Sequence, residues 1–183
     1  MENIKKKKEK YLEKLQLSPL KVLLNERIFV VYDKNKKPYS PKTTQGAKCN
    51  DANTWGTFDE AAKFYLSDSR MQGLGVEFCT LPNGKKLAGI DIDDCIDESG
   101  NISDEAMTLI KAMDSYTEYS PRGKGVHILF YMNTDSERLC NKFNISEGGY
   151  SINTPDNWCS HIEFYNASHY FTLTGKEFKN ERN

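Results

Sequence analysis

Apolar and polar positions alternate along the chain in runs short enough to be single strands. Residues 27–32, 76–80, 86–93 and 126–132 are rich in branched and aromatic side chains and predict strands. Residues 161–165 and 169–175 predict two more, joined by a tight turn at 166–168. Apolar residues spaced three or four apart predict helices over 1–17, after Thr57, after Ser103 and over 135–143. This mixture of strands and helices predicts an α+β fold.

Turn and cap residues divide these elements. Gly73 and Gly75 predict a turn before the strand at 76–80. Asn83-Gly84 is a strong hairpin signal, so strands 76–80 and 86–93 are expected to pair. Thr57 and Glu60 have the capping-box spacing. Residues 144–160 have no regular pattern and predict a long, mobile loop.

The predicted strand at 86–93 ends in Asp91-Ile92-Asp93. Alternate side chains of a strand share a face, so the two aspartates lie on one side, with Cα atoms roughly 6.5 to 7 Å apart. Paired carboxylates of this kind suit hard cations and the two-metal sites of phosphoryl transfer. The alternative is an acidic strand end that faces water, and the motif alone does not decide. An EF-hand is excluded because Cys95 and Ile96 occupy positions that need a ligand and glycine.

Two further segments carry candidate chemistry. Ser120-Pro-Arg-Gly-Lys-Gly125 is a glycine-rich turn that lets backbone N–H groups and Lys124 approach phosphate, although it lacks Walker spacing. His127 follows it in an apolar strand, where it is either a phosphate-binding residue or a core histidine. Glu163 stands between apolar neighbours, as a metal ligand or a solvent-facing acid.

A basic loop over residues 33–42 surrounds an aromatic side chain. Lysines around a tyrosine suit phosphate pairing and base stacking with single-stranded nucleic acid. An ordinary polar loop fits the same composition. The candidate contacts are Lys36, Lys37, Tyr39 and Lys42.

Composition restricts the classes of protein. The 183 residues are 38% hydrophobic and 28% charged, which is typical of a globular chain of one domain. A net charge of -1 does not itself indicate a nucleic-acid-binding protein. Five cysteines without a CxxC pair predict reduced, structural thiols and no zinc site. No apolar run reaches membrane-spanning length and no signal peptide is evident, so a cytoplasmic protein is expected.

Taken together and in order, these motifs resemble the archaeo-eukaryotic primase superfamily, and more narrowly the primase-polymerase domains of phage and plasmid replication proteins. The resemblance rests on residues 54–61, 89–94, 116–127, 162–165 and 170–175. It implies a catalytic core with a mixed or antiparallel sheet flanked by helices and a small N-terminal αβ lobe. It also implies a helical segment at 1–26, a catalytic domain at 27–176 and a polar tail at 177–183 that leads to a further C-terminal region.

The resemblance also implies roles for single residues. Asp91, Asp93 and Glu163 match the acidic ligands of two Mg²⁺ or Mn²⁺ ions, and Ser120, Lys124 and His127 match the residues that hold the nucleotide's phosphates. His169 stands where the family usually has arginine, and Arg122 stands where a small residue is common. His169 is therefore a weaker nucleotide-binding candidate, since histidine is only partly charged near neutral pH.

The implied activity is template-directed nucleotidyl transfer by a DNA primase-polymerase. Its expected partners are a single-stranded DNA template, dNTPs or NTPs, and a replicative helicase or a helicase region of the same protein, in a bacterial host. The alternative is a replication-initiation or single-stranded-DNA-binding module on the same fold, with weak catalysis or none.

Overall fold

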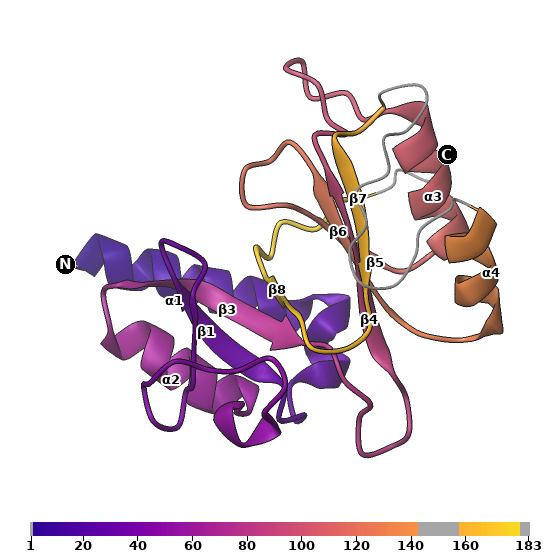
Figure 1. Cartoon of the computed structure of the whole chain (residues 1–183). Coiled ribbons are helices and arrows are strands. Elements are labelled where there is room, and N and C mark those ends of the chain that lie inside the picture. Colours follow the sequence, from indigo (N-terminus) through magenta and orange to yellow (C-terminus); the bar gives the residue numbers. More distant parts are fainter. Residues whose placement is uncertain (1, 143–157, 180–183) are drawn as a thin grey trace. The chain divides into compact units, whose positions relative to one another are not determined.

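The computed structural model describes residues 2–142 and 158–179. The chain divides into two compact units, residues 1–78 with 167–176, and residues 79–166 with 177–183. Each unit contains an antiparallel four-stranded sheet and helices (Figure 1). The fold is therefore α+β, as predicted. The boundaries expected at residues 26 and 176 remain a prediction.

The first unit joins two helices to its sheet, whose strand order is β2-β1-β3-β8. Its elements are α1 (Glu2–Leu17), the 3-10 helices η1 (Pro19–Leu23) and η2 (Ala52–Thr54), α2 (Phe58–Ser67), β1 (Phe29–Asp33), β2 (Pro38–Tyr39), β3 (Met71–Glu77) and β8 (Tyr170–Thr172). The predicted capping box begins α2: Thr57 accepts from the Glu60 backbone, and the Glu60 side chain accepts from the Thr57 backbone.

The apolar face of α2 explains how this unit packs. Phe58 is buried and meets Phe29 of β1 edge-to-face, with ring centres 5.6 Å apart. Helix α1 is tied to the sheet by Tyr11, whose hydroxyl donates to the Leu173 carbonyl and accepts from the Leu74 N–H. Phe58 and Tyr65 of α2 are buried, as are Leu12 and Leu15 of α1, whereas Ile4 near the start of α1 is exposed.

The second unit has the strand order β5-β6-β4-β7, and every neighbouring pair is antiparallel. Its elements are β4 (Leu87–Asp93), α3 (Asp104–Met113), β5 (Tyr116–Tyr119), β6 (Val126–Tyr131), α4 (Thr134–Lys142) and β7 (His161–Tyr165). Ser103 caps α3 by accepting from the Ala106 N–H, as predicted.

The two faces of this second sheet differ. Ile90 and Ile92 of β4, with Ile128 of β6, are fully buried against the apolar side of α3, including Leu109. Because side chains alternate along a strand, the residues between them point to the opposite face. That opposite face is called here the polar face and is defined by Glu118, His127, Asp91, Glu163 and Asp93.

The predicted hairpin between strands 76–80 and 86–93 is wrong. The turn at Asn83-Gly84 forms, with Gly84 at φ +81°, but only one isolated bridge, between Thr80 and Lys86, follows it. Strand β3 instead pairs with β1 and β8, while β4 pairs with β6 and β7. The chain therefore leaves one sheet and enters the other at this turn.

Two other local predictions from the sequence also differ from the structure. Gly73 and Gly75 lie inside β3 rather than in a turn before it. The Tyr32 ring lies where a Cβ atom of residue 73 would be, and the Tyr170 ring lies where a Cβ atom of residue 75 would be, so glycine is needed at both strand positions. Strand β7 forms over the predicted residues, whereas β8 covers only Tyr170–Thr172 of the predicted 169–175, and the two strands pair in different sheets. Most of the predicted loop at 144–160 lies outside the described residues. None of the described helices is long and apolar enough to cross a membrane.

Candidate active site on the second sheet

Strand β4 places both aspartates of the opening motif on one face. Ile90 and Ile92 are fully buried on the α3 side, so Asp91 and Asp93 project from the polar face. Their side chains are 22% and 33% exposed, enough to meet a ligand from solution. The shared face that the sequence predicted is confirmed.

The strand register lines up four polar residues across the sheet. Asp91 of β4 pairs with Glu163 of β7 on one side and with His127 of β6 on the other. His127 in turn pairs with Glu118 of β5. Directly opposite residues of antiparallel strands have Cβ atoms roughly 4.5 to 5.5 Å apart. The order Glu118–His127–Asp91–Glu163 is therefore one continuous row.

His127 lies between two carboxyl groups in this row. Its Nε2 is 3.7 Å from Asp91 Oδ1, and its Nδ1 is 3.7 Å from Glu118 Oε1. The His127 side chain is only 5% exposed. The structure thus brings His127 next to a predicted metal ligand. Sequence reasoning missed Glu118, because only the register of β5 against β6 places it beside His127.

Glu163 has a second polar neighbour on its own strand. Tyr165, two residues along β7, forms a side-chain hydrogen bond with Glu163. Burial raises the pKa of Tyr165, and the charges of Glu163 and Asp91 raise it further. Tyr165 therefore keeps its proton and is a donor to the carboxylate. The alternation along β7 is a signal that could have identified it.

Asp93 lies one position further along the same face and is bordered by two basic residues. Arg122 Nη2 is 3.4 Å from Asp93 Oδ1, and both side chains are partly exposed. His161 of β7 is directly opposite Asp93 in the register and is exposed. Arg122, whose role the sequence left uncertain, is thus the neighbour of a predicted metal ligand.

The glycine-rich turn leads directly into the row. The Ser120 N–H donates to the Gly125 carbonyl and the Gly123 N–H to the Ser120 carbonyl, with Gly123 at φ +72°. Ser120 is buried and Lys124 is exposed. The turn therefore positions Lys124 three residues before His127, at the end of β6 where Asp93 also lies.

His169 differs from the arginine that the resemblance would suggest. It belongs to the first unit, where its ring meets Phe171 edge-on and its carbonyl accepts from the Phe78 N–H. Burial lowers its pKa below 6.5. His169 is therefore mostly neutral at pH 7 and does not replace a fixed positive charge.

The basic residues proposed for DNA contact lie on the β1–β2 hairpin of the first unit and just after it. Lys36 and Lys37 are exposed at the turn, and the Lys37 ammonium lies 5.5 Å from the centre of the Tyr39 ring. Tyr39 donates to Asp33, and the exposed Lys42 donates to the Asn53 carbonyl. Lys37 and Tyr39 thus lie together on the hairpin, whereas the Lys42 side chain is directed to the Asn53 backbone.

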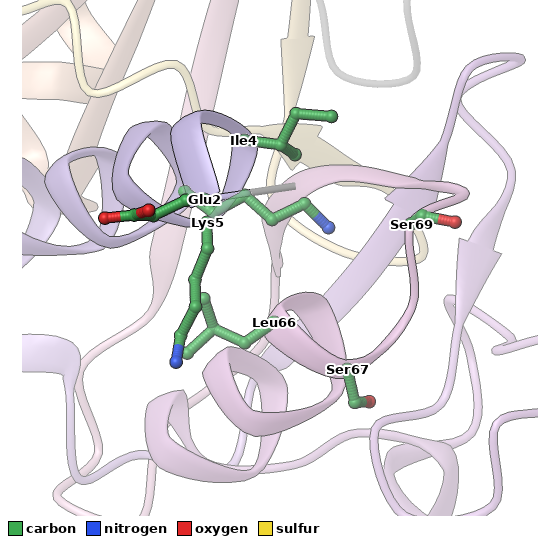
Figure 2. Close-up of a pocket in the computed structure, with 7 residues that line it drawn as sticks. Glu2, Ile4, Lys5, Leu66, Ser67 and Ser69 are labelled. Atoms are coloured by element: carbon green, nitrogen blue, oxygen red, sulfur yellow. The ribbon is translucent and has the colours of Figure 1, made fainter.

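A pocket elsewhere in the first unit contains none of the predicted site residues. Figure 2 shows it between the start of α1 and the end of α2. Lys8, one of its lining residues, is buried and donates to the Tyr65 and Asp68 carbonyls at the end of α2. This lysine satisfies a helix C-terminus instead of lying on a solvated face.

The donor chemistry of the polar face suits a hard divalent cation. Asp91, Asp93 and Glu163 offer carboxylate oxygens, the ligands that Mg²⁺ and Mn²⁺ favour, from two adjacent strands. In the described part of the chain, however, no three His, Cys, Asp or Glu side chains are gathered closely enough to hold a metal ion. Binding a cation there requires the carboxylates to turn toward one another.

The search of curated proteins found a phage protein that is similar to this chain. The chain is 29% identical over 168 residues, 90% of its length, to a protein named DNA Primase-polymerase from Nitratiruptor phage NrS-1. It spans about a fifth (21%) of the length of that relative. No protein-family model matches the sequence. The similarity supports the resemblance to primase-polymerase domains that the motifs predicted.

Proposed function

We propose that this chain is the catalytic domain of a primase-polymerase that joins nucleotides on a single-stranded DNA template. In this reaction a 3′-hydroxyl attacks the α-phosphate of a nucleoside triphosphate and pyrophosphate leaves. The similarity to a phage primase-polymerase and the composition of the polar face both support this activity.

Asp91, Asp93 and Glu163 would hold Mg²⁺ or Mn²⁺. Bound divalent ions activate the attacking oxygen and neutralise charge on the leaving pyrophosphate. Tyr165 supports this role because its hydrogen bond orients the Glu163 carboxylate. Arg122 is close enough to Asp93 to neutralise it while the site holds no cation.

The residues on the other side of Asp91 would bind the triphosphate. His127 presents an imidazole edge beside Asp91, and Lys124 adds an exposed ammonium from the preceding turn. Ser120 closes this turn through its backbone and thereby fixes the path that leads to Lys124. No residue in this scheme acts as a covalent nucleophile.

The observation that carries the proposal is the single cross-strand row. Three strands bring Glu163, Asp91 and His127 into register, with Asp93 on the same face. A solvated acidic strand end would not require a buried histidine next to the acids. Cation ligands and a phosphate-binding group placed side by side are what nucleotidyl transfer requires.

The experiment incubates the protein with a single-stranded DNA template, labelled dNTPs or NTPs, and Mg²⁺ or Mn²⁺, with and without an annealed primer. Products that form without a primer identify a primase, and products that require one identify a polymerase. The absence of product in every combination, together with retained DNA binding, would overturn the catalytic proposal in favour of a replication-initiation or DNA-binding module.

A further inference from the structure

The net charge of the whole chain hides a sharp division between the two units. In the first unit, 16 lysines and arginines stand against 10 aspartates and glutamates, which gives a formal charge of +6. In the second unit, 9 stand against 16, which gives −7. Surface charge of one sign concentrates partners of the opposite sign. A polyanion is therefore attracted to the first unit rather than to the second.

Helix α1 contributes the largest group of these positive charges. It contains six lysines and three glutamates. At 3.6 residues per turn, Lys7, Lys10 and Lys14 follow one another at spacings of three and four residues, so they form a single stripe along the helix. The glutamates fall in a neighbouring sector of the helix. All three lysines are exposed, and they are called here the lysine stripe.

The charge of the lysine stripe is not consumed by ion pairs within the helix. Glu2 lies 3.0 Å from the Lys6 ammonium, and Glu9 lies 3.9 Å from the Lys5 ammonium. Within residues 2–142 and 158–179, no ion pair joins a lysine of the stripe to an acid. Two of the three glutamates of α1 therefore pair with lysines outside the stripe, and the stripe presents its charge to solvent.

The helix that carries the stripe is fixed in place by its other side. Leu12 and Leu15 are buried in the core of the first unit. The Tyr11 hydroxyl donates to the Leu173 carbonyl, and the Lys8 ammonium donates to backbone carbonyls at the end of α2. Because the helix is anchored at several points, the stripe is a preformed surface whose binding requires little further ordering of the backbone.

The segment after β8 extends this surface. A Cβ atom at Gly175 would lie 3.5 Å from Lys14 Cβ, so the backbone there runs directly beside the end of the stripe. The next residue, Lys176, is exposed. The fold of the first unit thus brings a fourth lysine, from a distant part of the sequence, close to the lysine stripe.

We propose that the lysine stripe of α1, together with Lys176, binds the phosphate backbone of the single-stranded DNA template. The choice of DNA as the polyanion rests on the function proposed above. From Lys7 to Lys14 the helix rises about 10.5 Å, a length over which a stacked strand carries about three phosphates. Lysine acts as a point charge and the stripe has no aromatic side chain, so this contact is independent of base sequence, unlike stacking on Tyr39.

An anionic membrane is a poorer partner for the same lysines. A helix that binds a membrane surface inserts an apolar face between the lipid head groups. The apolar residues near the middle of α1, Leu12 and Leu15, are already buried inside the first unit. The phosphates of a nucleic acid, in contrast, need only the charged side of the helix.

The test measures affinity for DNA and requires no activity. Fluorescence anisotropy of a labelled oligothymidine gives the binding constant K at several salt concentrations. We expect Lys7→Gln, Lys10→Gln and Lys14→Gln each to reduce the slope of log K against log salt by about 0.7, because each removes one phosphate contact. Glutamine has nearly the helix propensity of lysine, so the fold should survive, and circular dichroism checks this.

Two control variants separate the stripe from the general charge of the unit. Lys5→Gln removes the same charge from the same helix but outside the stripe, so its slope should equal that of the wild type. Lys10→Arg keeps the charge in the stripe, and its slope should also be unchanged. The three stripe variants should lose the same factor of affinity for an oligothymidine as for a strand of mixed sequence, because backbone contacts do not depend on the bases.

Failure of this surface and failure of the proposed function are distinguishable. Stripe variants whose slopes match that of Lys5→Gln would overturn the DNA contact, even if incorporation is normal. Weaker binding of the stripe variants to phosphatidylserine vesicles, with unchanged affinity for DNA, would also overturn it, in favour of a membrane. If the wild type incorporates no nucleotide on any template while the slopes change as expected, the proposed function fails and the DNA-binding stripe stands.

Discussion

At the residue scale, His127 shows how a buried polar group is explained by its neighbours. A lone histidine in an apolar strand is usually a core residue, and the sequence left both readings open. The structure places it between Asp91 and Glu118, within 3.7 Å of each. Two acids of the polar face are thus among its neighbours.

Replacing this histidine should affect nucleotide use more than DNA binding. We expect His127→Asn to raise the KM for nucleoside triphosphate by about tenfold or more, because a hydrogen bond to a charged group contributes roughly 1.5 to 3 kcal/mol. Incorporation kinetics measure this effect, and fluorescence anisotropy measures affinity for single-stranded DNA. Equal losses in both would identify a core histidine instead.

The buried carboxyl group of Glu77, in the first unit, should make the free energy of unfolding depend on pH. Burial raises its pKa to about 7 from 4.5, against a smaller opposite effect of a hydrogen bond with Cys49. Below pH 4.5 the Glu77 carboxyl group is protonated in both the folded and the unfolded state, so its contribution to stability is fully present. This contribution is lost as the pH rises through 7, because the unfolded state loses the proton more easily than the folded state. The loss amounts to about 3 kcal/mol.

Glu77→Gln should therefore gain stability relative to the wild type as the pH rises. Urea unfolding at pH 4.5, 6 and 8 measures the free energy of unfolding of both proteins, with the exposed Glu105→Gln as control. The variant's advantage should increase by about 3 kcal/mol across this range. Parallel pH profiles for Glu77→Gln and the wild type would show that Glu77 titrates normally.

At the element scale, alternation along β4 was sufficient to predict that Asp91 and Asp93 share one face. Glu163 was joined to them by the family resemblance, not by its own local pattern. Pairing was not predictable, because a strand's own sequence does not specify which neighbour it meets. Glu118 was missed for this reason, since only the register brings it next to His127. Tyr165 could have been placed on the face of Glu163 by alternation along β7 alone.

Gly125, just before β6, lies against the backbone of β4, so a substitution there tests whether these two strands must approach closely at the site. A Cβ atom there would collide with the Ile92 carbonyl oxygen on β4. We expect Gly125→Ala to lower the free energy of unfolding by about 1 to 3 kcal/mol and to impair incorporation, because β6 must move away from Asp91. Thermal unfolding and nucleotide incorporation measure the two effects.

The matched control is Gly46→Ala. Its new Cβ would meet only Lys37 Cε at 3.8 Å, an ordinary contact, and its φ is not in the left-handed region. Stability should stay unchanged or rise slightly. If both glycine variants unfold at the same temperature, the strands do not require close approach at Gly125.

At the scale of the whole molecule, the chain forms two sheets where local signals predicted hairpins. The Asn83-Gly84 turn and the turn at 166–168 each connect strands of different sheets. Turn residues specify a reversal of the chain, but the partner of each strand depends on which apolar faces can be buried together. The α+β class was therefore predictable, whereas the division into two sheets was not.

Nucleic-acid binding should depend on salt and on the basic hairpin. For single strands, each neutralised phosphate changes the slope of log K against log salt by about 0.7. We expect Lys36→Gln, Lys37→Gln and Lys42→Gln each to reduce the slope by about this amount, and Lys63→Gln, an exposed lysine on α2, to leave it unchanged. Anisotropy titrations at several salt concentrations measure the slope. Equal slopes in all four variants would exclude the hairpin as a DNA contact.

The most direct measurement of the central claim is the rate of nucleotide incorporation by Asp91→Asn and Asp93→Asn, beside Glu105→Gln. Each substitution removes a charge while it preserves side-chain size, and circular dichroism checks that the fold survives. The account predicts that both aspartate variants fall to background while Glu105→Gln matches the wild type. Incorporation at the wild-type rate by either aspartate variant would contradict the assignment of the polar face as the active site.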